Sequence, residues 1–153
     1  MKRFFVTLIL TTVIAGVLTY AMPKNFCNYV YDIAPDGTVS VYCKSSQLDG
    51  IDMGSGKIVE CSPSELQAVL NKCHGVDGVS VTVEGSQEDV TRIMQLLTLT
   101  VVSNYQLDGL VVVCGKSDKV NGGVLLDGNL VNVQIAYKDG VVTVGSPLIL
   151  GSY

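Results

Sequence analysis

The sequence predicts an α+β fold in which a mixed or antiparallel sheet carries two helices on one face, preceded by an N-terminal signal or anchor helix. Three observations predict it. Short runs rich in Val, Ile and Tyr alternate apolar with polar residues between tight-turn signals, as half-buried strands do. Two other segments repeat apolar residues at helical spacing behind capping residues. An uncharged run follows a basic pair at the start of the chain.

The N-terminal run has the length of a membrane-spanning helix. Lys2 and Arg3 precede residues 4–22, which carry no charge. A helix of that length extends roughly 28 Å, close to the thickness of a bilayer's hydrocarbon core. We expect either an uncleaved signal anchor or a signal peptide that is cleaved at the small-x-small tripeptide Thr19-Tyr20-Ala21. A buried core helix is the alternative, but it gives no reason for the basic pair.

The direction of insertion follows from the basic pair, because positive charge stays on the cytoplasmic side. We therefore expect residues 1–22 to be a signal peptide or transmembrane anchor, and residues 23–153 to be a single extracytoplasmic domain, either held at the cell membrane or secreted. That domain has eight Lys and Arg residues against fourteen acids, so its formal charge is 8 − 14 = −6. Nucleic-acid binding needs a net positive surface, so we expect no nucleic acid as a partner.

Six Asp-Gly dipeptides separate the strand-like runs, with aspartates at positions 36, 49, 77, 108, 127 and 139. Asp-Gly favours tight turns because both residues tolerate a positive φ. The clearest predicted hairpin turns at Lys138-Asp139-Gly140. The predicted strands are Tyr29–Ile33, Thr38–Lys44, Lys57–Glu60, Val79–Glu84, Thr100–Asn104, Leu110–Cys114, Val124–Asp127, Val131–Tyr137 and Val141–Gly145.

Two amphipathic helices interrupt the strands. The first begins at Ser62, with Glu65 three residues later as a capping box requires, and ends at His74-Gly75. The second begins at Ser86, with Asp89 as the equivalent acid. Their apolar stripes are Leu66, Val69, Leu70 and Cys73 in the first helix and Val90, Ile93, Met94 and Leu97 in the second. Each stripe has the pattern that covers one face of a sheet.

The five cysteines leave more than one interpretation open. An exported location permits disulfides, but an odd number leaves at least one thiol over. Core thiols, one disulfide and a metal site are the alternatives, and no spacing matches a known zinc motif. Cys43 and Cys114 each end a strand-like run, where cysteine commonly packs as a small apolar residue. The cysteines are Cys27, Cys43, Cys61, Cys73 and Cys114.

Motifs for nucleophilic, acid–base or phosphate chemistry are incomplete. His74 is the single histidine, and its place at a predicted helix end is explained by the helix dipole. Gly115-Lys116-Ser117 ends like a phosphate loop, but Leu110 stands where that loop needs its first glycine. Gly54-Ser55-Gly56-Lys57 lacks both the first glycine and the final hydroxyl residue. Both segments are predicted to be turns.

Carboxylate pairs and the C-terminal serine give no stronger candidates. Asp49 and Asp52 lie in a Gly-rich loop without EF-hand spacing, and a weak cation site there is a minor hypothesis. Glu88 and Asp89 open a helix, where negative charge is favoured. Ser146 lacks the glycine-flanked elbow of a serine hydrolase. We therefore expect no catalytic, cofactor-binding or metal-binding residue, and no enzyme activity.

The end of the chain carries a family resemblance. The segment Val131–Ala136, a short hairpin, the segment Val142–Ile149 and a final Tyr153 resemble the C-terminal end of the YwmB family. These are exported or membrane-anchored proteins of Gram-positive, mostly spore-forming bacteria. The resemblance implies a curved α+β sheet similar to that of the TATA-box-binding protein. It brings no catalytic residue, because the family has no established biochemical activity.

A structural interpretation also accounts for the C-terminal residues. Pro147 is expected to end the strand pairing, and the apolar residues 148–150 are expected to pack against the core. A fixed C-terminus could also present its carboxylate to a partner protein.

Together, these observations predict a non-enzymatic envelope protein that acts by contact with an unknown envelope protein, with a link to sporulation or cell-wall processes. It would associate with the membrane through residues 4–22. The alternatives are a ring-building or secretion-channel module, a domain that binds a small ligand or lipid, and an unrecognised cell-wall hydrolase. Residues His74, Asp49 and Glu60 would be the acids and bases of such a hydrolase.

Overall fold

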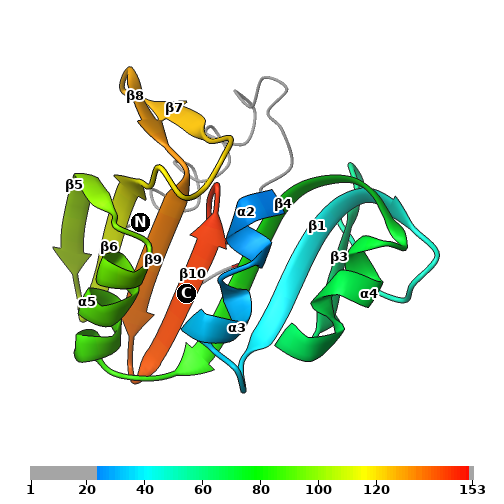
Figure 1. Ribbon diagram of the computed structural model, residues 1–153, viewed down its shortest axis with the longest axis horizontal. Coiled ribbons are helices and arrows are strands. Elements are labelled where there is room, and N and C mark those ends of the chain that lie inside the picture. Colours follow the sequence, from blue (N-terminus) through cyan, green and yellow to red (C-terminus); the bar gives the residue numbers. More distant parts are fainter. Residues whose placement is uncertain (1–23, 152–153) are drawn as a thin grey trace.

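The computed structural model describes residues 24–151. The chain has an α+β fold built on one eight-stranded sheet (Figure 1). Its strand order is β2-β3-β1-β4-β10-β9-β6-β5, and every paired neighbour in it is antiparallel. The predicted sheet is therefore antiparallel rather than mixed. A separate two-stranded hairpin, β7-β8, projects from one end of this sheet (Figure 1).

The described elements follow the chain from an N-terminal pair of short helices to a C-terminal hairpin. The helices are α2 (Lys24–Cys27), α3 (Val30–Ile33), the 3-10 turn η1 (Pro63–Glu65), α4 (Leu66–Leu70) and α5 (Gln87–Leu96). The strands are β1 (Thr38–Ser46), β2 (Ile51–Asp52), β3 (Lys57–Cys61), β4 (Cys73–Glu84), β5 (Thr100–Leu107), β6 (Leu110–Lys116), β7 (Val124–Leu126), β8 (Asn129–Val131), β9 (Val133–Lys138) and β10 (Val141–Ser146).

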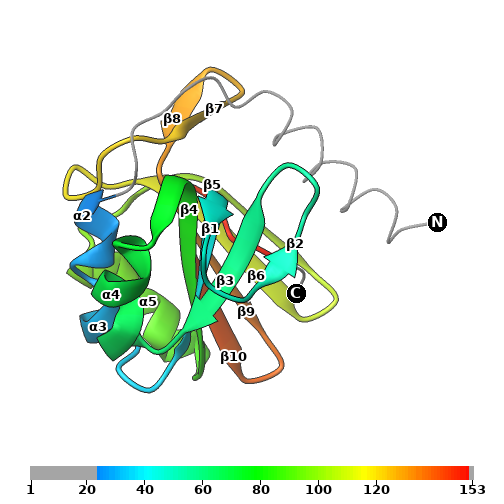
Figure 2. The same ribbon diagram turned by 90° about the vertical axis from the view of Figure 1, so that its right-hand side faces the viewer.

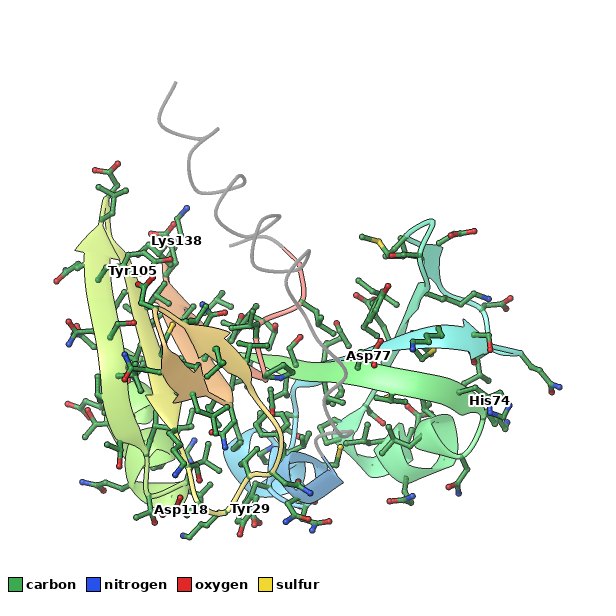
Figure 3. All side chains as sticks on the ribbon, turned by 90° about the horizontal axis from the view of Figure 1, so that it is seen from above. Tyr29, His74, Asp77, Tyr105, Asp118 and Lys138 are labelled. Carbon is green, nitrogen blue, oxygen red and sulfur yellow. The ribbon has the colours of Figure 1, made fainter. Side chains whose placement is uncertain are left out.

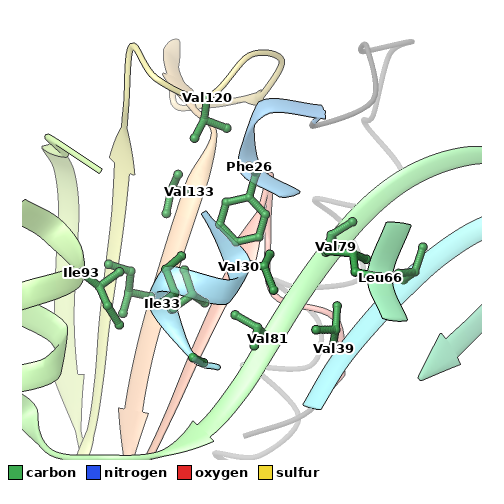
Figure 4. Close-up of a cluster of buried hydrophobic side chains, with 14 of the residues drawn as sticks. Phe26, Val30, Ile33, Val39, Leu66, Val79, Val81, Ile93, Val120 and Val133 are labelled. Carbon is green, nitrogen blue, oxygen red and sulfur yellow. The ribbon is translucent and has the colours of Figure 1, made fainter. Parts of the chain in front are cut away.

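The helices lie on one face of the sheet, and the main core fills the space between (Figures 1 and 2). Phe26, Val30 and Ile33 of the first two helices are buried against this face, with Phe26 fully enclosed. Figure 4 shows Phe26 and Val30 beside Val79 and Val81 of β4. Alternate residues of β1, β9 and β10 and of the second half of β4 face this core, as the predicted period of two requires.

Among residues 24–151, no helix lies on the opposite face of the sheet, which we call the open face. A second apolar cluster covers only part of it, around strands β6 and β9. Residues 147–150 fold back over β9 and β10 there, and Ile149 is 5% exposed. Its backbone N–H donates a hydrogen bond of 3.0 Å to Oε1 of Gln134. The predicted packing of an apolar C-terminal segment is thus confirmed for this residue.

Asp36-Gly37 lies in a turn that the Gly37 N–H closes on the Ala34 carbonyl at 3.1 Å, and three further Asp-Gly dipeptides form predicted hairpin turns. Asp108, Asp127 and Asp139, each with the glycine that follows, have positive φ at both positions, as type I′ hairpin turns require. They connect β5 to β6, β7 to β8 and β9 to β10. Asp77 instead occupies a bulge, because Tyr42 and Cys43 of β1 pair with Gly78 and Val76 on either side of it.

The predicted strand Tyr29–Ile33 is wrong, because Val30–Ile33 is the helix α3. The buried residues Phe26, Val30 and Ile33 recur at i, i+4 and i+7, which is a helical spacing. Two helices of four residues each do not form from local preference alone. Burial of these three side chains against the sheet stabilises them instead.

The predicted strand Val131–Tyr137 is divided in the structure. Asn132 separates β8 from β9, and its buried side chain bonds Ser117 and Val120 rather than continuing the strand. The first predicted helix also ends earlier than expected, at Leu70. The segment of β4 that follows begins at Cys73 and therefore includes His74, which pairs opposite Ser45. Strand β2 was not predicted.

Both predicted helix starts are confirmed by their hydrogen bonds. The backbone N–H and the hydroxyl of Ser62 donate to the Glu65 carboxylate at 3.0 and 2.7 Å. The same two groups of Ser86 donate to the Asp89 carboxylate at 2.8 and 3.2 Å. Each carboxylate therefore satisfies a donor that the first turn of a helix leaves unpaired.

The predicted signal or anchor segment, residues 4–22, lies outside the described residues. Between residues 24 and 151, no helix has the length and apolar character needed to cross a bilayer.

Candidate functional site

The structure keeps the sequence's candidate catalytic residues apart. His74 lies exposed at one end of β4, far from Lys138 and Tyr105 on the open face (Figure 3). Asp49 lies in the loop that precedes β2, and the Asp52 carboxylate accepts a 2.7 Å hydrogen bond from the N–H of Gly54, which stabilises a turn. Glu60 lies in β3, so the three candidate acids and bases His74, Asp49 and Glu60 belong to three separate segments of the chain.

The two serine candidates are enclosed. Ser117 of the Gly115–Ser117 segment is fully buried, and its hydroxyl donates a hydrogen bond to the Leu97 carbonyl. Ser146 is also fully buried, and its Oγ has no hydrogen-bond partner in the described part of the chain. Neither hydroxyl is accessible to a substrate from solvent.

Burial favours the neutral form of three of the described thiols. Cys43, Cys61, Cys73 and Cys114 are free thiols, and three of them are buried. Burial raises the pKa of Cys43 and of Cys61 to about 11, and it also raises the pKa of Cys114. Because the thiolate is the nucleophile and metal ligand, these cysteines have the chemistry of core residues. Within residues 24–151, no cluster of three or more His, Cys, Asp or Glu side chains could hold a metal ion.

The open face presents an ordered row of side chains across the sheet. Strand pairing places Thr38 of β1 opposite Thr82 of β4, which is opposite Thr143 of β10. The row continues through Ala136 to Val112 and Tyr105. Neighbouring strands are about 4.8 Å apart, so the three threonines form a regular line of hydroxyl and methyl groups. We call Thr38, Thr82 and Thr143 the threonine row.

The middle of this row lines a hollow in the open face. The hydroxyls of Thr82 and Thr143 are hydrogen-bonded at 3.1 Å. The hollow has a volume of about 330 Å³, and the folded-back residues Ile149 and Leu150 form one wall. Its lining is Thr82, Ala136, Lys138, Asp139, Val141, Thr143, Ile149 and Leu150. We call this the open-face hollow.

The surroundings of the hollow carry net negative charge. Lys138 and Asp139 belong to its lining, and an adjoining depression, which shares Thr82 and Val141, adds Asp36 and Glu84. Three carboxylates and one ammonium group therefore surround apolar and hydroxyl side chains. Such a surface can accept hydrogen bonds, attract cations and bury aliphatic groups.

The threonine row was missed from the sequence, although its signal was present. Each threonine occupies a polar position of a predicted alternating strand, at the start of Thr38–Lys44 and within Val79–Glu84 and Val141–Gly145. Alternation assigns these residues to one face of their strands. It does not predict that β1, β4 and β10 are neighbours in that register.

Comparisons with known proteins identify no family. No family model matches the chain, and neither the curated proteins nor the solved structures give a match. The resemblance to the YwmB family stays a prediction from residues 131–153.

Proposed function

We propose that this chain is a non-enzymatic envelope protein that binds another protein through the open face of its sheet. In this proposal residues 4–22 anchor or export the chain, and the acidic domain lies outside the cytoplasm. The observation that carries it is the threonine row at the open-face hollow, on a sheet face that the described helices leave uncovered. The resemblance to the exported YwmB family is consistent with this location.

The chemistry of the hollow favours one class of occupant. Val141 is 38% exposed and Ile149 and Leu150 form the wall, so aliphatic side chains can be buried here. Asp36, Glu84 and Asp139 outnumber Lys138, which favours basic groups over acidic ones. We propose that the occupant is a segment of a partner protein that carries both basic and aliphatic side chains.

An interaction role also agrees with the position of the single histidine, which is remote from the threonines. Activation of a hydroxyl nucleophile needs an adjacent base whose pKa lies near neutrality. The single histidine lies at the far end of β4 (Figure 3). The threonine hydroxyls are therefore suited to hydrogen bonding.

Photo-crosslinking in living cells tests the proposal on the full chain. A photoreactive phenylalanine analogue replaces Thr82 in the open-face hollow or, as a control, the exposed Gln67 on the helix side. We expect a discrete protein adduct at Thr82 that is absent at Gln67, with the crosslinked partner peptide containing basic and aliphatic residues.

Charge reversal tests whether that adduct depends on the proposed contacts. Glu84→Lys or Asp139→Lys is expected to reduce the adduct at Thr82 by about tenfold, because like charges across an interface are strongly unfavourable. Glu60→Lys makes the same charge change on β3, outside the hollow, and should leave the adduct unchanged. Identical adducts at both positions, adducts only with lipid, insensitivity to both Glu84→Lys and Asp139→Lys, or an equal loss with Glu60→Lys would contradict the proposal.

A further inference from the structure

The two edges of the sheet differ in how they are protected against pairing with another chain. At one edge, β2 has only two residues and includes the charged Asp52. At the other edge, β5 has eight residues, seven of them exposed, and it contains no charged residue, proline or glycine (Figure 1). Proteins usually guard a long edge strand with such residues because its free backbone groups can pair with a further strand.

The regular part of β5 is long enough to accept a strand. The only irregularity in its pairing with β6 lies between Val101 and Ser103, at its beginning. From Ser103 to Leu107 the register is unbroken. Tyr105 and Leu107, which share the open-face side of the strand, are 42% and 45% exposed.

The charge pattern of this edge fits a second copy of the same chain. The domain as a whole has a charge of −6, so two copies repel each other over most of their surfaces. The neutral edge avoids that repulsion. Asp108 follows one end of β5, and at the other end Lys116 of β6, which pairs with Thr100, forms an ion pair of 3.0 Å with Asp118. Antiparallel pairing of two β5 strands would place the two Asp108 carboxylates at opposite ends of the pair, so these like charges would stay apart.

We propose that two copies of this protein associate through antiparallel pairing of their β5 strands, with Tyr105 near the two-fold axis. In this arrangement Tyr105 faces its counterpart, Ser103 faces Leu107, and Asn104 faces Gln106. Aromatic and amide cross-strand pairs of this kind stabilise antiparallel sheets. The two eight-stranded sheets become continuous, and both open faces lie on the same surface. The inference uses a surface separate from the open-face hollow, so it does not depend on the proposed function.

Cysteine crosslinking of the full chain in cells tests this arrangement. Tyr105→Cys is compared with Gln67→Cys on α4 and with the unaltered chain, each treated with a bismaleimide reagent. We expect Tyr105→Cys to give a product of twice the chain's mass, whereas the other two stay monomeric. Three of the native cysteines are buried and two are partly exposed, so the unaltered chain measures their background reaction.

A second substitution in the Tyr105→Cys background separates specific pairing from random collision. Gln106→Lys places like charges on both strands of the pair and is expected to reduce the dimer product by about tenfold. Gln67→Lys, the matched control, should have no effect. A monomer from Tyr105→Cys, an equal dimer from Gln67→Cys, a ladder above the dimer, or an adduct with a different protein would each overturn the inference.

Discussion

The substitution Gly145→Ala should detach the C-terminal residues from the open face. Gly145 lies in β10, directly beneath the folded-back residues 147–150. A Cβ atom at this position would lie 2.5 Å from the Ile149 nitrogen and 2.5 Å from the Leu148 carbonyl carbon, and it would also contact the Leu148 oxygen. These are backbone atoms that a rotamer change cannot move away.

The magnitude follows from what residues 148–149 contribute when they are packed. Burial of an isoleucine side chain contributes about 1.5–3 kcal/mol, and Ile149 is 5% exposed. Its hydrogen bond to Gln134 adds about 1 kcal/mol. We therefore expect Gly145→Ala to lower the free energy of unfolding by about 3 kcal/mol. With a urea m-value of about 1.5 kcal/mol per M, the midpoint should fall by about 2 M.

Urea unfolding of the purified chain, followed by far-ultraviolet circular dichroism, measures this loss. The matched control is Gly78→Ala on β4, where a new Cβ meets the tip of the Leu150 side chain at 3.3 Å and the Ser146 carbonyl oxygen at an ordinary contact distance of 3.7 Å. That side chain can move by a few tenths of an ångström, so the control should unfold close to the unaltered chain. Equal midpoints for the two variants would refute the packing described for residues 147–150.

Three further predictions concern buried and capping groups. Asn132→Ala leaves the buried backbone N–H and C=O of Ser117 without their side-chain partner. Urea unfolding should therefore show a free energy of unfolding that is lower by about 3 kcal/mol. A decrease of less than about 1 kcal/mol would contradict this role of Asn132. Burial raises the pKa of the Cys43 thiol from 9.0 to about 11. Iodoacetamide labelling at pH 8, followed by mass analysis, should therefore find Cys43 at least about a hundredfold less reactive in the folded chain than in urea. Equal labelling rates would show that Cys43 is accessible as a thiolate in the folded chain. Hydrogen bonds from Ser62 and Ser86 lower the pKa of Glu65 and of Asp89 below the values in the unfolded chain. The two carboxylates therefore stabilise the helix starts above about pH 4, and this stabilisation is lost as the pH falls through the lowered pKa values. Helix content that stays constant during an acid titration would argue against these caps.

Local sequence signals predicted the elements whose structure depends on neighbouring residues. The turn at Asp139 needs only two residues that tolerate positive φ, and the caps at Ser62 and Ser86 need only an acid three residues later. These features depend on residues that are close in the sequence, so they form independently of distant contacts. The class of fold, α+β with an antiparallel hairpin at the C-terminus, followed from them.

Features that depend on distant contacts were not predictable in the same way. The helix at Val30–Ile33 exists because its apolar side chains meet a sheet formed by later residues. The break at Asn132 depends on Ser117, fifteen residues away in the chain. The threonine row requires that three strands pair in one register. Two of its members, Thr38 and Thr143, come from opposite ends of the domain's sequence. Sequence alternation fixes the side of a strand that a residue occupies, but it does not fix the neighbouring strand.

The orientation of the chain across the membrane is the claim on which the proposed binding role depends. Paired fusions of alkaline phosphatase and green fluorescent protein after Tyr153 measure it directly, because the phosphatase folds only outside the cytoplasm and the fluorescent protein becomes fluorescent inside. The account predicts an active phosphatase fusion and a dark fluorescent fusion. A fluorescent fusion with an inactive phosphatase would place the domain in the cytoplasm and contradict the account.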